Sequence, residues 1–118
     1  VKAAKEIKKM GPKHLVIKKG EHGALLFGEE KIFFAPALPL EEVFDPTGAG
    51  DSFAGGFIGY LSKTGGLSFE NMKSAVIYGS VMASFCVEKF GTQRLTEITQ
   101  QDIKERAQEF VSLASFKI

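Results

Sequence analysis

One segment near the middle of the chain has the residue types that handle a phosphate. It reads Asp45-Pro-Thr-Gly-Ala-Gly-Asp51, and a helical pattern follows over about residues 51–61. The first backbone amides of a helix have no partner within it, and the helix dipole places partial positive charge there. Because the loop Gly48-Ala49-Gly50 is made of small residues, an anion can approach these amides closely. The segment therefore predicts a site that holds a phosphoryl group and stabilises the charge that develops during its transfer.

Asp51, which follows the small residues directly, has two possible roles. A carboxylate held near a substrate hydroxyl can accept its proton as the oxygen attacks the γ-phosphate of ATP. Asp is also favoured at helix N-termini, where it caps backbone amides, and the local pattern leaves both roles open. The segment is not a Walker loop, because it lacks the Gly-Lys-Ser/Thr ending, and its glycine spacing is not that of the dinucleotide fingerprint.

Extended to Gly56 as Asp45-Pro-Thr-Gly-Ala-Gly-Asp-Ser-Phe-Ala-Gly-Gly56, the segment resembles the second signature of the ribokinase-like (pfkB) carbohydrate and nucleoside kinases. That signature reads Asp-Thr-x-Gly-Ala-Gly-Asp and precedes a helix with small residues. The resemblance covers essentially all 118 residues, as the C-terminal nucleotide-binding and catalytic part of a larger kinase domain. It implies an α/β fold, the ribokinase-like three-layer α/β/α sandwich. Of this fold the chain would be the C-terminal part only, with a mixed, mostly parallel sheet and a hairpin.

The resemblance also implies a reaction, which is ATP-dependent phosphorylation of a hydroxymethyl or other alcohol group on a small sugar or related carbohydrate. ATP and Mg²⁺ would be the cofactors. One alternative is a nucleoside (adenosine-type) kinase of the same family. Another is a non-catalytic, nucleotide-binding regulatory relative, although an intact Asp51 and an intact small-residue loop favour catalysis.

Catalytic roles are assigned by the resemblance to four consecutive residues. Asp51 matches the base of the family, and its anion hole is matched by Gly48, Ala49 and Gly50.

Nucleotide contacts are assigned to residues on either side of this motif. The segment Lys18-Lys-Gly-Glu-His-Gly23 resembles the turn that lies along the nucleotide, so Lys18, Gly20 and Gly23 carry over, although the family often has Thr at the position of Lys18. Taken alone, the two glycines mark an ordinary hairpin turn. Ser80 falls where the family often has a small polar residue near the adenine. The alternative for Ser80 is a helix serine bonded to its own backbone.

A monovalent cation site, for K⁺, is the last site that the resemblance implies. Its ligands would come from the loop of Asp45 and Thr47, together with the segment that follows the adenine-facing helix. Pro46 replaces the more frequent Thr, which removes a hydroxyl but leaves the carbonyl groups in place. From the residues alone, Asp45 is equally well a turn residue. His14 and His22 lack the acidic or cysteine partners of a metal site.

The elements that position these residues alternate in an α/β order. We expect a helix over residues 1–10, strands at His14–Lys18 and residues 23–27, a hairpin into Lys31–Ala35, and a short strand at residues 42–44. The last two helices should begin after Ser68 and Thr99, and Asp102 should complete a capping box. We assign to the core, rather than to a base-stacking platform, Phe33, Phe34, Phe53, Phe57 and Phe85. Residues 1–118 read as one unit without an internal boundary.

Composition restricts the partners further. The net charge is +1, which disfavours nucleic acid as the main partner. No apolar run approaches the length of a membrane span, and the single cysteine, Cys86, fits a buried structural thiol in a reducing, cytoplasmic setting. We therefore expect a small-molecule sugar or nucleoside partner, with no nucleic acid and no membrane. A homodimer is compatible with an exposed sheet edge.

Overall fold

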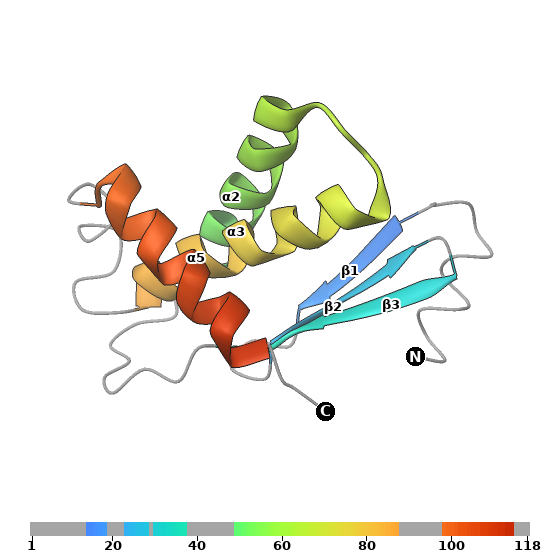
Figure 1. The fold of residues 1–118 in the computed structure, drawn as a ribbon, viewed down its shortest axis with the longest axis horizontal. Coiled ribbons are helices and arrows are strands. Elements are labelled where there is room, and N and C mark those ends of the chain that lie inside the picture. The colour runs from blue at the N-terminus through green and yellow to red at the C-terminus, as the bar shows by residue number, and fades with distance from the viewer. Residues whose placement is uncertain (1–13, 19–22, 29, 38–48, 88–97, 115–118) are drawn as a thin grey trace.

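Three strands precede three helices in the residues that this computed structural model describes, which are 14–18, 23–28, 30–37, 49–87 and 98–114 (Figure 1). The strands are β1 (His14–Lys18), β2 (Ala24–Gly28) and β3 (Lys31–Ala35). The helices are α2 (Ala49–Thr64), α3 (Phe69–Val87) and α5 (Gln100–Ala114). The helix expected over residues 1–10 and the strand expected at residues 42–44 lie outside the described residues. α3 is the central helix, because it contacts α2, α5 and the strands β2 and β3.

The described strands form an antiparallel sheet in the order β1-β2-β3. Leu15 of β1 pairs with Phe27 of β2, and Phe27 pairs in turn with Ile32 of β3. We expected the short buried strands to run parallel, but these strands supply only the hairpin part of the predicted mixed sheet. The reason is the length of the connections, because a parallel crossover needs a dozen or more residues.

The helix boundaries follow the capping residues that the sequence predicts. The Ser68 hydroxyl accepts a hydrogen bond of 3.2 Å from the amide of Asn71 at the start of α3. At the start of α5, Thr99 Oγ1 accepts from the Asp102 amide at 3.1 Å, and Asp102 Oδ2 accepts from the Thr99 amide at 3.0 Å. This reciprocal pair is the predicted capping box. α2 is longer than predicted, because it begins at Ala49 and ends at Thr64.

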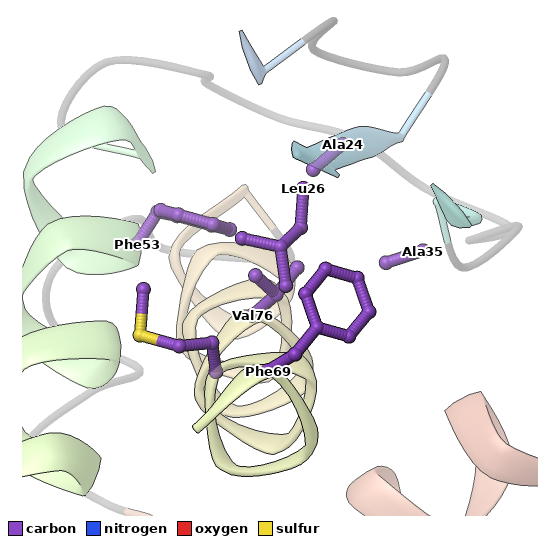
Figure 2. Packing of buried hydrophobic residues seen from close by; sticks show 7 residues of the cluster. Ala24, Leu26, Ala35, Phe53, Phe69 and Val76 are labelled. Atoms are coloured by element: carbon purple, nitrogen blue, oxygen red, sulfur yellow. The ribbon is translucent and has the colours of Figure 1, made fainter. Parts of the chain in front are cut away.

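One face of the sheet packs against α2 and α3 through a cluster of buried apolar side chains (Figure 2). Leu26 of β2 and Val76 of α3 are fully buried at its centre, and Phe53 reaches it from α2. Phe33 and Phe57 pack against this cluster, whereas Phe85 joins a second one between α3 and α5. These four Phe residues therefore belong to the core, as predicted.

The opposite face of the sheet is also apolar. Phe34 was predicted to be a core residue, but in the described structure it is 50% exposed and Ile32 is 56% exposed. The prediction is wrong here because successive strand residues point to opposite faces, so Phe34 points away from the side that Phe33 and Ala35 occupy. Leu25 and Phe27 pair directly with Phe34 and Ile32, so four large apolar side chains share this outer face.

α2 and α3 cross very closely, and two glycines make this possible. A Cβ atom on Gly79 of α3 would lie 2.8 Å from the Phe53 carbonyl oxygen and 3.1 Å from the Phe53 ring. A Cβ atom on Gly56 of α2 would lie 2.9 Å from the Tyr78 carbonyl oxygen. Side chains at these positions would push the helices apart, so the glycines set the position of α2 against the core.

The Gly79→Ala variant tests this contact. We expect the free energy of unfolding to fall by about 1–3 kcal/mol, the usual cost of overpacking a core, because the new methyl group meets fixed backbone. Chemical denaturation of the variant and the wild type measures the change.

Gly59→Ala, also on α2, is the matched control, because a Cβ built at Gly59 meets no described atom within 4 Å outside its own stretch of helix. Without a clash, this change should stabilise the protein by about 0.5–1 kcal/mol through helix propensity. Equal effects of the two variants would show that the close crossing has no energetic role.

Candidate functional site

The described residues include six of the ten predicted site residues. Ala49, Gly50 and Asp51 form the first turn of α2. Lys18 ends β1, Gly23 lies immediately before β2, and Ser80 lies on α3. The remaining four predicted residues lie outside the described residues: Gly20, Asp45, Thr47 and Gly48.

The first turn of α2 is the helix start at which the motif predicts anion binding. The helix begins at Ala49, so the amides of its first residues have no carbonyl partner inside the helix. Gly50 is exposed, and its lack of a side chain leaves the backbone of this turn open. Ala49 and Gly50 thus lie at the positive end of the helix dipole, with Gly50 exposed.

Asp51 is the third residue of α2 and its side chain is exposed. An N-cap residue precedes the first helical residue and accepts hydrogen bonds from amides in the first turn. Asp51 lies two positions beyond Ala49, and no hydrogen bond joins its carboxylate to a described backbone amide. Asp51 thus lies two positions beyond the first helical residue that the structure describes, and its exposed carboxylate lies at the helix start.

Lys18 reaches the same helix turn from the end of β1. Its Nζ atom lies 3.5 Å from the Gly50 carbonyl oxygen and 5.4 Å from the centre of the Phe53 ring. A Cβ atom on Gly50 would lie only 3.1 Å from this Nζ. The structure thus brings together the predicted residues Lys18, Gly50 and Asp51, although the first is more than thirty residues away from the others along the chain.

Phe53 is a part of this arrangement that the sequence did not single out as a site residue. Its ring is buried in the core and stacks beside Phe57, with 6.2 Å between the ring centres. Gly79 packs against the same ring. Phe53 therefore gives the Lys18 ammonium a fixed aromatic surface, and no sequence pattern could have paired two residues so far apart.

Gly23 has a structural requirement of its own. It adopts φ +93°, a conformation that L-amino acid side chains rarely tolerate, and a Cβ atom there would collide with the Ala35 carbonyl oxygen. The ordinary-turn interpretation of this glycine is thus sufficient to explain it. Any contact between Gly23 and a nucleotide would be additional.

Ser80 is half-buried on α3, one residue after the glycine that contacts Phe53. No hydrogen bond of its hydroxyl is found with the described residues. By contrast, Ser84 Oγ on the same helix donates to the Val81 carbonyl oxygen at 2.6 Å. The self-bonded alternative for Ser80 is therefore not seen in the part of α3 that the structure describes.

Metal binding by protein side chains alone finds no support in the described residues. They contain no group of three or more His, Cys, Asp or Glu side chains that could hold an ion. The ring of His14 lies against Gly28, and its Nε2 atom is buried without a hydrogen-bond partner among the described residues. In the same part of the chain, no helix combines the length and the apolar character that crossing a membrane requires.

Comparison with known proteins finds relatives that are all kinases. Residues 1–99 match the family model of the pfkB family carbohydrate kinases. A nucleoside kinase of Methanothermobacter thermautotrophicus is 35% identical over 99 residues, which are 83% of this chain and 29% of that protein. A 1-phosphofructokinase of Bacillus subtilis is 31% identical over 100 residues, which are 85% of this chain and 32% of that protein.

A solved structure shows the same likeness. The aminoimidazole riboside kinase of Salmonella enterica, complexed with aminoimidazole riboside and an ATP analogue, superposes with a TM-score of 0.76 at 26% identity. The match covers 90% of this chain and 35% of that one, so the chain spans about a third of the length of such relatives. On the extent of the family match, the chain belongs to the pfkB family of carbohydrate kinases.

Proposed function

We propose that this chain is the catalytic, C-terminal part of an ATP-dependent kinase that phosphorylates the hydroxymethyl or another alcohol group of a small sugar or related carbohydrate. The observation that carries the proposal is the accessible Asp51 carboxylate in the first turn of α2, two residues after the helix begins. A base and an anion-binding helix start are thus adjacent. The similar proteins are named as kinases of sugars or of nucleosides.

The proposed mechanism divides two tasks between neighbouring residues. Asp51 accepts the proton of the acceptor hydroxyl as its oxygen attacks the γ-phosphate. The amides of Gly48, Ala49 and Gly50 stabilise the negative charge on the transferring group, because they are already oriented before the reaction begins. Catalysis then depends on positioning and on electrostatic stabilisation.

The phosphate end of ATP fits the described residues. Gly50 presents no side chain, the helix start supplies amides, and the Lys18 ammonium lies beside the same turn. Lys18, Gly20, Gly23 and Ser80 are the residues that we propose to lie along the nucleotide. Since the described residues lack an acidic cluster, Mg²⁺ would enter on the ATP phosphates, as it commonly does. When bound, it neutralises charge on those phosphates.

The rest of the three-layer sandwich would come from polypeptide outside the described residues. The outer face of the sheet supports this proposal, because the large apolar side chains of Ile32 and Phe34 are half exposed there. A sheet with two apolar faces needs a layer on each side. We propose that a second helical layer covers this face and that additional strands run parallel to β1, in a protein of a reducing, cytoplasmic compartment.

A nucleoside kinase is the second candidate function. The nucleoside kinase of Methanothermobacter thermautotrophicus is somewhat more similar than the phosphofructokinase, at 35% against 31% identity. The names of these relatives cover both classes of acceptor, so experiment decides between a sugar and a nucleoside. A non-catalytic relative would have no need for an accessible base at Asp51.

Asp51→Asn is the direct test of the base. In the full-length protein with Mg-ATP and a panel of pentoses, hexoses, inositol and nucleosides, we expect one acceptor class to give ADP. The variant should lower kcat with that acceptor roughly 100- to 10,000-fold, as expected for a lost general base, while its Kd for ATP changes little. Coupled ADP release and calorimetric titration measure the two quantities.

Glu70→Gln is the matched control for this substitution. Glu70 is also an exposed carboxylate in the first turn of a helix, α3, but it pairs with Lys73 at 3.4 Å and lies away from the anion-binding turn. The Glu70→Gln variant should therefore keep the wild-type kcat. If Asp51→Asn is as active as Glu70→Gln, then Asp51 only stabilises the N-terminus of α2, and the proposed mechanism is wrong.

The monovalent cation site proposed at Asp45 and Thr47 predicts a dependence on K⁺. Exchanging K⁺ for choline at constant ionic strength should lower kcat, because the cation would polarise the anion-binding loop without touching the acceptor. The KM for the acceptor should stay nearly constant. A rate that is independent of the cation would remove this site from the proposal.

A further inference from the structure

α5 begins just after residue 99, where the match to the family model ends. It nevertheless packs on the C-terminal half of α3 (Figure 1), where a buried apolar cluster joins the two helices. In this cluster Phe110 of α5 is 1% exposed and Phe85 of α3 is 2% exposed. α5 is therefore held firmly against the helix that carries Ser80, although the resemblance assigns α5 no role.

Arg106 of α5 adds a polar contact to this apolar interface. Its Nη1 atom donates a hydrogen bond of 3.2 Å to Ser84 Oγ on α3. Its guanidinium carbon lies 4.0 Å from the centre of the Phe85 ring, a distance at which a planar guanidinium can stack on an aromatic face. One side chain of α5 thus contacts two neighbouring residues of α3 through two kinds of interaction.

Ser84 is a buried polar residue, and its hydroxyl is bonded in two directions. It is 8% exposed, and its Oγ atom donates to the Val81 carbonyl oxygen at 2.6 Å. A serine hydroxyl has a single proton to donate, so only its lone pairs remain for a partner on α5. The Arg106 guanidinium complements them as a charged donor, which makes the hydrogen bond stronger than one between neutral groups.

Ser84 follows Ser80 by one helical turn on the same side of α3. Ser80 is half-buried and is one of the residues that we propose to lie along the nucleotide. The hydrogen bonds of the helix backbone link successive turns, so a shift of the turn at Ser84 would move Ser80 as well. The contact with Arg106 and the proposed contact with the nucleotide therefore depend on each other.

We propose that Arg106 is a positioning residue for nucleotide binding, which holds through Ser84 the turn of α3 on which Ser80 lies along the nucleotide. The proposal rests on the kinase function above and makes α5 a part of its nucleotide-binding end. Arg106 acts on α3 and does not touch the nucleotide itself. Its loss should therefore weaken the binding of ATP and leave the chemical step unchanged.

Arg106→Met in the full-length protein tests the hydrogen bond to Ser84. Met keeps an apolar contact with the Phe85 ring but has no donor. We expect the Kd for ATP to rise roughly 5- to 20-fold, as for the loss of one hydrogen bond to a charged group. At saturating ATP, kcat should stay close to the wild-type value. Calorimetric titration without an acceptor measures Kd, and ADP release with an acceptor that the wild type phosphorylates measures kcat.

A conservative variant and a double-mutant cycle test the route of the effect. Arg106→Lys should recover part of the affinity for ATP, because it keeps a charged donor. Ser84→Ala removes the acceptor, so Arg106→Met should add little to the loss of affinity in the Ser84→Ala background. Losses that multiply in the double variant would overturn the proposed route through Ser84.

Two control variants separate positioning from a general loss of stability. Phe110→Leu weakens the same interface but keeps the hydrogen bond to Ser84, so it should lower the thermal midpoint and leave the Kd for ATP unchanged. Lys104→Met removes an exposed cation from the same helix and should change neither quantity. An equal loss of ATP affinity in Phe110→Leu and Arg106→Met, or wild-type affinity in Arg106→Met, would overturn the proposal.

The same measurements separate this inference from the kinase function itself. If the wild type phosphorylates an acceptor and Arg106→Met binds ATP as tightly, the kinase function stands and the role of Arg106 is refuted. If the wild type binds no ATP, the kinase function fails and the role of Arg106 fails with it.

Discussion

Gly79 on α3 lies against the backbone and the ring of Phe53 on α2, and Gly56 on α2 lies against the backbone of α3. This contact fixes the height and the direction of α2 above the sheet. Because Phe53 is only two residues beyond Asp51, the same contact fixes the first turn of the helix. The position of the proposed base and of the anion-binding amides thus depends on two positions where only hydrogen fits.

The sheet contributes the other half of the arrangement. β1 ends at Lys18 just where α2 begins, so its last side chain lies beside the first helical turn. Phe53 links the two, since its ring belongs to the core on one side and faces the Lys18 ammonium on the other. Core packing and site geometry therefore share a side chain. Substitutions at Phe53 would change both the stability of the fold and the geometry of the site. Substitutions at Lys18 and Asp51 are more informative, because both side chains are exposed and can be changed without disturbing the core.

Local sequence signals predicted the described strands and helices well, because the causes of these elements are local. Ser68 and Thr99 start helices through hydrogen bonds to residues three positions further on, and such spacing is readable in the chain. The contact of Lys18 with Gly50 and Phe53 was not predictable, since it depends on how β1 and α2 pack. The exposure of Phe34 was missed for a related reason: composition indicates that a Phe is buried, but which face of a strand is covered depends on the neighbouring layers.

The central claim is that the start of α2 holds the transferring phosphoryl group with Asp51 beside the acceptor oxygen. A crystal structure of the full-length protein with ADP, aluminium fluoride and a phosphorylatable acceptor tests it most directly. We expect fluoride atoms within hydrogen-bond distance of the amides of Gly48, Ala49 and Gly50, and the acceptor oxygen within hydrogen-bond distance of the Asp51 carboxylate. A fluoride group bound elsewhere, or an acceptor oxygen remote from Asp51, would contradict it.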